Sequence, residues 1–155
     1  MTTEDGGGTA TEEAARFWRE RHLCVLATRR PDGSTHLTPV GATYDPATGT
    51  ARVITSSTSA KARNVAAAGP SARVALTQVD GRRWTTLEGT AVVSADTAAV
   101  REAERRYAER YRTPRVNPQR VVIEITVDRV MGTQRPAVGL QDGAPPSDAT
   151  NTSAT

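Results

Sequence analysis

The chain has 155 residues, a net charge of +3 at pH 7 and a single cysteine. This length suits one domain, and one thiol excludes an internal disulfide framework. The sequence does not start with a basic segment followed by an apolar stretch, and no apolar run is long enough to span a bilayer. We therefore expect a cytoplasmic protein with no membrane partner.

The two ends differ in composition from the middle. Residues 1–10 and 133–155 are polar and rich in Gly, Pro, Ser and Thr, without apolar periodicity, so we expect disordered ends around one domain at 11–132. The ends carry acidic side chains, which leaves the domain more basic than the whole chain and favours an anionic partner. A solvated, arginine-rich surface explains the charge equally well. No RNA-binding or helix-turn-helix signature is present, so we expect no nucleic acid.

The first half of the domain predicts a helix and three antiparallel strands. Residues 11–21 start with glutamates, end with arginines and carry apolar side chains on one side, which indicates a short amphipathic helix. Strands are expected at residues 22–28, 35–44 and 51–55, separated by Pro- and Gly-containing turns. Pro39 and Gly41 interrupt the second strand, which therefore belongs at a sheet edge or carries a bulge.

The second half predicts two further helices and three further strands. Helices are expected at residues 59–68 and 96–112, and strands at 72–79, 83–94 and 120–130. Asp80-Gly81 is a strong hairpin signal between two of these strands. Six or so mostly antiparallel strands with inserted helices indicate a mainly β fold, a small β-barrel.

The stretch at residues 54–64 contains the chain's only lysine, Lys61, after a hydroxyl-rich turn at the start of a helix. Hydroxyls, free backbone N–H groups and an ammonium group together bind phosphate. An ordinary Ser/Thr helix cap followed by a solvated lysine fits the same residues. The solitary lysine of an arginine-rich chain favours phosphate, because a compact point charge suits that ligand.

The sequence offers no set of side chains for catalysis. We find no metal-ligand spacing, no nucleophile elbow and no phosphate-binding P-loop, so we expect no catalytic side chain and no metal site. An enzyme of this composition relies on a bound cofactor for its chemistry.

Three other segments are candidates for lining such a site. Pro39-Val40-Gly41 lets a flat ring approach the backbone, although a structural bulge explains it as well. Gln78 and Trp84 flank the Asp-Gly turn, where they face a ligand or pack on neighbouring strands. Residues 107–115 are dense in Arg and Tyr, which favour anion recognition and interfaces, and a solvated helix face is the alternative.

Two long runs of the sequence resemble a known family. QVDGRRWTTLEG at residues 78–89 and RYAERYRTPRVNPQRVVIE at residues 106–124 carry the resemblance, which extends over about residues 11–132. They are similar to the pyridoxamine-phosphate-oxidase-like split β-barrel superfamily, in its actinobacterial branch that uses the deazaflavin coenzyme F420.

The resemblance implies a split β-barrel homodimer with cofactor sites at the subunit interface. It implies F420-dependent hydride transfer from the reduced deazaflavin to a conjugated small molecule, foremost biliverdin to bilirubin. The implied cofactor-binding residues are Pro39, Val40, Gly41, Thr55, Ser56, Ser57, Ser59, Ala60, Lys61, Asn64, Gln78 and Trp84, some of them from the second subunit. Charge type alone suggests Arg110, Arg112 and Arg115 for substrate carboxylates. Two alternatives stay open, namely an FMN-dependent oxidoreductase of the same fold and a non-catalytic cofactor-, bilin- or haem-binding barrel.

Overall fold

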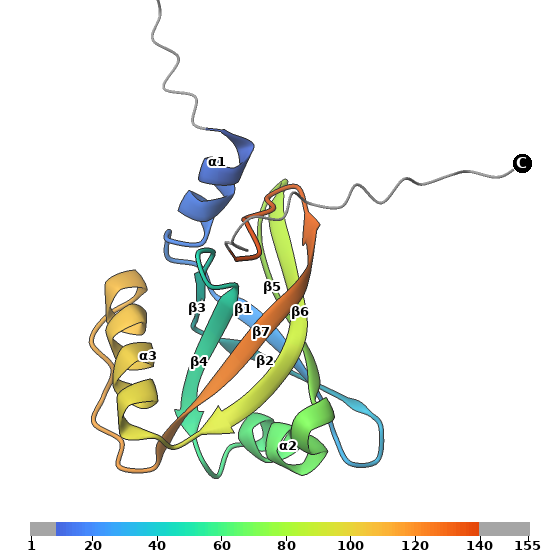
Figure 1. Cartoon of the computed structure of the whole chain (residues 1–155), viewed down its shortest axis with the longest axis vertical. Coiled ribbons are helices and arrows are strands. Elements are labelled where there is room, and N and C mark those ends of the chain that lie inside the picture. Colours follow the sequence, from blue (N-terminus) through green and yellow to red (C-terminus); the bar gives the residue numbers. More distant parts are fainter. Residues whose placement is uncertain (1–8, 140–155) are drawn as a thin grey trace, which may run out of the picture.

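The computed structural model describes residues 9–139. Their strands form one seven-stranded sheet in the order β2-β1-β5-β6-β7-β4-β3, and every pairing is antiparallel. The sheet curls around its own apolar face (Figure 1). The strands are β1 (Cys24–Arg29), β2 (Thr35–Val40), β3 (Ala42–Asp45), β4 (Thr50–Ser56), β5 (Arg73–Asp80), β6 (Arg83–Ser94) and β7 (Arg120–Gly132).

The strand expected at residues 35–44 is two strands, so the six or so strands expected are seven among the described residues. β2 pairs with β1 at one edge of the sheet, and β3 pairs with β4 at the other edge. Only Gly41 separates them, so the chain passes at this point from one edge to the other. Pro39 lies in the edge strand β2, where a missing N–H is tolerated, as predicted.

The core lies inside the curled sheet. Leu26, Leu76, Leu87, Ile123 and Ile125 are fully buried there and come from four different strands. A bulge between Glu88 and Gly89 bends β6 against β7. A Cβ on Gly89 would lie 2.1 Å from the Thr126 carbonyl oxygen, so only glycine permits this close strand approach.

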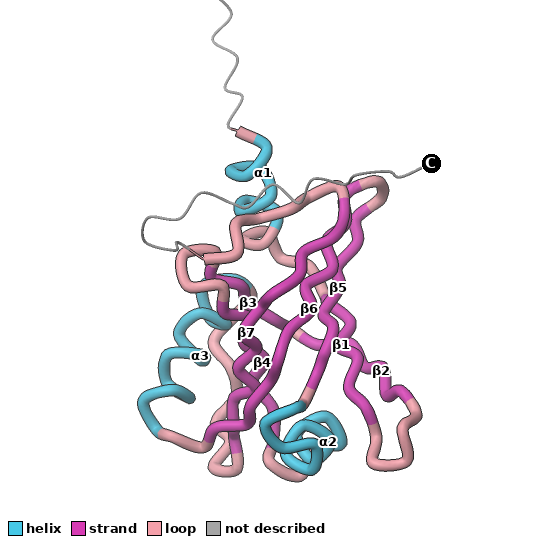
Figure 2. The backbone as a smooth tube through the Cα atoms, turned by 45° about the vertical axis from the view of Figure 1, so that its right-hand side comes forward, coloured by secondary structure: helices cyan, strands magenta, loops and turns pink. Residues whose placement is uncertain are grey.

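Three α-helices of the described residues surround the sheet (Figures 1 and 2). They are α1 (Ala10–Phe17), α2 (Ala60–Ala68) and α3 (Thr97–Arg110), and a short 3-10 turn, η1 (Gly69–Ser71), follows α2. α1 lies at one end of the sheet and α2 at the other, while α3 packs outside β3, β4 and β7. No described helix is long and apolar enough to cross a membrane.

The folded part extends past the predicted boundary at residue 132. Gln134 donates its backbone N–H to the Trp84 carbonyl at 3.0 Å, and Pro136 is buried. The Tyr44 hydroxyl donates to the Ala137 carbonyl, and Gly139 donates to the Pro46 carbonyl at 2.8 Å. Residues 133–139 therefore pack on the domain although they lack apolar periodicity. The disorder expected for residues 1–8 and 140–155 lies outside the described residues.

Candidate functional site

A cavity of about 340 Å³ opens where the two edges of the sheet meet. The β2–β3 junction, the start of α2, the segment after α3 and the start of β7 all border it. The lining residues are Pro39, Val40, Gly41, Ile54, Lys61, Tyr107, Arg112, Pro114, Arg115 and Arg120. The fold thus brings together six of the predicted site residues, from three separate stretches of sequence.

The charge of this cavity is of one sign. Its lining includes one lysine and three arginines but no carboxylate. Arg120 is already engaged, because it donates to Glu104 at 3.1 Å and to the Arg115 carbonyl at 2.6 Å. Lys61 is half-buried, and this burial lowers the pKa of its ammonium group. Among residues 9–139 Lys61 has no ion-pair partner. An anion entering the cavity would supply the missing counter-charge.

The hydroxyls before α2 are largely used by the protein itself. Ser59 caps the helix by accepting from the Ala62 N–H at 3.3 Å, and it also accepts from the Thr55 hydroxyl at 3.0 Å. The Ser56 hydroxyl accepts from the Asn117 amide at 2.8 Å. Ser57 is exposed, and its hydroxyl has no partner among the described residues. Ser59 therefore acts as an ordinary helix cap, and the Ser57 hydroxyl remains available to a ligand.

Backbone donors complete the anion-binding features at the start of α2. Within residues 9–139 no acceptor pairs with the backbone N–H of Ala60 or of Lys61. The first turn of α2 also holds no acidic side chain. Two free N–H groups, the helix dipole and the Lys61 ammonium group thus favour an anion at this position.

Gly41 lies against an aromatic ring of the protein itself. A Cβ on Gly41 would lie 2.7 Å from Tyr107 Cε2, so the missing side chain makes room for the Tyr107 ring. Tyr111 stacks beside Tyr107 with ring centroids 4.9 Å apart, and its hydroxyl accepts from the Ala42 N–H at 3.0 Å. The two tyrosines of α3 and its C-terminal cap therefore fix the β2–β3 junction, and Tyr107 forms one wall of the cavity.

A second cavity of about 410 Å³ continues the first one past Tyr107. The two share Gly41, Tyr107 and Arg112, and the second adds Arg21, Leu23 and Tyr111. Sequence reasoning missed Arg21, Leu23 and Arg120 as lining residues. The position of Arg120 near Lys61 depends on strand pairing across the sheet, which sets Ser56 opposite Arg120 and which no local pattern reveals.

Two predicted site residues lie in the interior instead. The side chain of Gln78 is 1 % exposed, and its amide donates to the Phe17 carbonyl at 3.2 Å. Arg110 is also buried and donates to Gln78 Oε1 at 2.6 Å, to the Ala42 carbonyl at 2.6 Å and to the Glu20 carbonyl at 2.8 Å. These bonds tie α3 to β3, β5 and the segment after α1, and they leave neither side chain facing the cavity.

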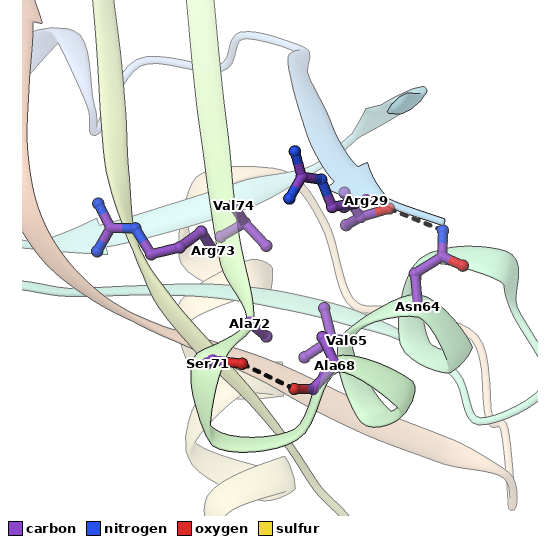
Figure 3. A pocket seen from close by; sticks show the side chains of 9 residues that line it. Arg29, Asn64, Val65, Ala68, Ser71, Ala72, Arg73 and Val74 are labelled. Atoms are coloured by element: carbon purple, nitrogen blue, oxygen red, sulfur yellow. Dashed lines mark hydrogen bonds between the residues drawn. The ribbon is translucent and has the colours of Figure 1, made fainter. Parts of the chain in front are cut away.

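Asn64 and Trp84 are also apart from Lys61's cavity. The Asn64 amide donates to the Thr28 hydroxyl at 3.0 Å and lines a separate hollow of about 230 Å³ between α2, β1 and β5 (Figure 3). Trp84 lies next to the β5–β6 turn, at the end of the sheet away from α2. Its side chain is 37 % exposed.

Fold and sequence comparisons agree on the class of protein. The curled antiparallel sheet divided at Gly41, with helix-bordered cavities, is a split β-barrel. The pyridoxamine 5'-phosphate oxidase family model matches residues 10–134, and the chain belongs to this family. It is 54 % identical over 123 residues to an F420H(2)-dependent biliverdin reductase of Mycobacterium tuberculosis (strain CDC 1551 / Oshkosh), covering 79 % of this chain and 88 % of that protein.

Solved structures confirm the fold. A conserved hypothetical protein of Mycobacterium tuberculosis superposes with a TM-score of 0.64 at 26 % identity, covering 84 % of this chain and 88 % of the other. An F420 reductase superposes with a TM-score of 0.61 at 21 % identity, covering 81 % of this chain and 98 % of the other.

Proposed function

We propose that this protein is an F420-dependent oxidoreductase that transfers a hydride from the reduced deazaflavin to a conjugated substrate, most specifically biliverdin, giving bilirubin. The observation that carries the cofactor site is the cavity with four cationic side chains and no carboxylate at the start of α2. The activity is carried over from the relative that is 54 % identical and is named for it.

The residues present fit the cofactor. Lys61, the Ser57 hydroxyl and the free N–H groups of Ala60 and Lys61 would hold its phosphate. The segment 39–41 would lie along the ring. Arg112 and Arg115 are exposed at the rim, where they suit the anionic oligoglutamate tail or the carboxylates of the substrate. When bound, the deazaflavin supplies two electrons as a hydride.

The side chains of this cavity then have binding and orienting roles. Among its lining residues none is a histidine, cysteine, aspartate or glutamate. The Tyr107 and Tyr111 rings and Leu23 form an apolar surface in the adjoining cavity, and Arg21 and Arg112 flank it. This arrangement suits a flat substrate with carboxylates, in contact with the ring site.

The outer face of the sheet supports a homodimer. Strand register places Val25, Leu37, Val79, Trp84 and Met131 on one outer face, and each is at least 37 % exposed. Five large apolar side chains on one antiparallel face indicate a subunit interface with a second copy. In such a dimer Trp84 is available to the partner's cofactor site, which accounts for its distance from Lys61 of its own chain.

Equilibrium titration and turnover test the proposal together. Reduced and oxidised F420 and FMN are titrated separately, with tryptophan fluorescence as readout, and biliverdin absorbance is then followed with each reduced cofactor. We expect low-micromolar F420 binding and loss of biliverdin absorbance only with reduced F420. Tighter FMN binding supports the FMN-dependent alternative. F420 binding without turnover of biliverdin would show that biliverdin is not the substrate. If no acceptor in a panel of conjugated compounds is reduced, the result supports the non-catalytic alternative.

Sedimentation tests the dimer separately. Replacing Leu37, which is 65 % exposed, by Arg should shift the protein from dimer to monomer, because a buried unpaired charge is costly at an interface. Arg30→Glu, in the exposed turn before β2, is the control and should leave the dimer intact. A wild-type protein that sediments as a monomer at high micromolar concentration contradicts the interface.

A further inference from the structure

Tyr107 lies between the two cavities of the proposed site. It lines both of them, together with Gly41 and Arg112. Its ring lies against Gly41, because Cζ, the ring carbon that bears the hydroxyl, would be 3.5 Å from a Cβ at that position. Gly41 belongs to the segment that is proposed to lie along the cofactor ring. The Tyr107 hydroxyl is therefore held where the cofactor and the substrate would meet.

The Tyr107 hydroxyl is free and accessible. Among residues 9–139 it makes no hydrogen bond, yet it is not one of the unpaired polar atoms that are shut off from solvent. The neighbouring Tyr111 differs, since its hydroxyl donates to the His22 carbonyl at 2.7 Å and accepts from the Ala42 N–H at 3.0 Å. A phenol hydroxyl both donates and accepts. That of Tyr107 is available to a ligand, whereas that of Tyr111 is held by the backbone.

No other side chain of the adjoining cavity offers a transferable proton. The lining residues of this cavity are Arg21, Leu23, Gly41, Tyr107, Tyr111 and Arg112. An arginine guanidinium stays protonated in proteins, so Arg21 and Arg112 can pair with carboxylates but do not release a proton. Lys61 borders only the cofactor cavity, where its charge is proposed to meet phosphate. Tyr107 is thus the one free proton donor among the described residues around the substrate.

The reaction of the proposed function needs such a donor. The conjugated substrate accepts a hydride at one carbon, and the electron pair of the π bond that breaks moves along the conjugation to a heteroatom, a ring nitrogen in biliverdin. The substrate is thereby reduced, and the deazaflavin that supplied the hydride is oxidised. One hydrogen and both electrons arrive as the hydride, so one further proton must reach the substrate.

We propose that Tyr107 is the proton donor of this reaction, an inference that rests on the proposed function. Its hydroxyl donates a hydrogen bond to the substrate nitrogen, the O–H bond breaks as the N–H bond forms, and the phenolate recovers a proton from the solvent. The ring is held in place by its fit against Gly41 and by Tyr111, whose ring centroid is 4.9 Å away. Sequence analysis did not identify this role, because the position of Tyr107 depends on how α3 packs on the β2–β3 junction.

Tyr107→Phe tests the proton transfer, since it removes the hydroxyl and keeps the ring. The measurements are biliverdin reduction at saturating reduced F420 and equilibrium binding of biliverdin to the F420-free protein. We expect kcat to fall at least about a hundredfold, the usual contribution of a positioned general acid. The dissociation constant of biliverdin should rise no more than about tenfold, as expected for one neutral hydrogen bond. The melting temperature should stay unchanged, because this hydroxyl has no partner among residues 9–139.

Tyr44→Phe is the matched control. The Tyr44 hydroxyl donates to the Ala137 carbonyl, and Tyr44 lines neither cavity of the proposed site. We expect this variant to keep the wild-type kcat and to melt at a lower temperature, because it loses a hydrogen bond within the protein. The two phenol-to-phenyl changes should therefore separate, one affecting the reaction and the other affecting stability.

The outcomes distinguish this inference from the proposed function. If the wild type reduces biliverdin and Tyr107→Phe has a kcat close to that of the wild type, Tyr107 is not the donor and only this inference is overturned. The same holds if biliverdin binding weakens as much as kcat falls, since Tyr107 would then act in binding alone. If the wild type reduces another acceptor of the panel instead, that acceptor replaces biliverdin in the test. A wild type that reduces no acceptor overturns both the proposed function and the proton donor.

Discussion

The starts of α1 and α2 both carry a hydroxyl cap, yet they differ in charge. At α1 the Thr9 hydroxyl accepts from the Glu12 N–H at 3.2 Å, and the Glu12 carboxylate accepts from the Thr9 N–H at 3.2 Å. Glu12 and Glu13 place two negative charges in that first turn. At α2 Ser59 caps the helix, but the first turn has no acidic residue and contains Lys61.

At α1 the chain itself neutralises the positive end of the helix dipole, whereas at α2 it does not. The capping box and glutamates of α1 neutralise the positive end of its dipole within the chain. The start of α2 keeps that potential and adds an ammonium group, which lowers the stability of the free protein. An unneutralised helix start beside a cationic cavity is thus more specific evidence for an anion site than its hydroxyl-rich sequence.

Removing the charge at α2 should have the largest effect. We expect Lys61→Ala to weaken F420 binding by about 1.5–3 kcal/mol, the range of a charge-assisted hydrogen bond. Stability should change little or rise, because the burial that lowers the Lys61 pKa also makes its charge costly in the free protein. The measurements are a cofactor titration and a thermal melt of the free variant.

The control for Lys61 lies on the same helix. Arg63 is exposed and does not line the cavity, so Arg63→Ala should bind F420 like the wild type. Equal dissociation constants for Lys61→Ala and the wild type would remove Lys61 from the phosphate site and with it the proposed contrast between the two helices.

Giving α2 an acidic first turn should make it behave like α1. Ala60→Asp places a carboxylate at the first helical position, which should stabilise the free protein by about 0.3–1 kcal/mol. The same carboxylate would repel the cofactor phosphate, and we expect affinity to fall by about 1 kcal/mol. Chemical unfolding should therefore show a higher free energy of unfolding, while the F420 titration should show a lower affinity. A more stable variant with unchanged affinity would show that the anion binds elsewhere.

Most of the fold could be predicted because its signals are local. Turn residues, alternation and caps indicated the helices and nearly all of the strands within a few residues of their observed ends. The division at Gly41 could not be predicted, because β2 and β3 are defined by partners at opposite edges of the sheet. Residues 133–139 were assigned to the tail since they pack as irregular chain, through Pro136 and the Tyr44–Ala137 hydrogen bond, with no period to detect.

The site was predictable where sequence neighbours act together. The segment 39–41, Lys61, Arg112 and Arg115 border one cavity. The family resemblance implied the segment 39–41 and Lys61, and charge type alone suggested the two arginines. Gln78 and Arg110 are polar residue types that usually face solvent, yet strand register and the turn of α3 direct both inward to satisfy each other. No composition or spacing rule distinguishes such a buried pair from a ligand-binding pair.

The smallest expected effect concerns α3, where ion pairs between its own side chains stabilise the folded protein. Hydrogen bonds from Arg105 and Arg106 hold the pKa of Glu102 at about 2, below its ordinary value of 4.5. Because the folded pKa is the lower one, the carboxylate stabilises the protein above its unfolded pKa, and this contribution is lost as pH falls toward about 2. At pH 7, Glu102→Gln should lower the free energy of unfolding by about 0.2–0.5 kcal/mol for each ion pair removed. The difference in this free energy between wild type and variant, measured by urea unfolding, should vanish as the pH approaches about 2.

F420 affinity should stay unchanged, since Glu102 does not line the cavity. A variant that unfolds like the wild type at neutral pH would show that these exposed pairs contribute nothing, whereas a loss of cofactor affinity would tie the α3 charge network to the site at α2.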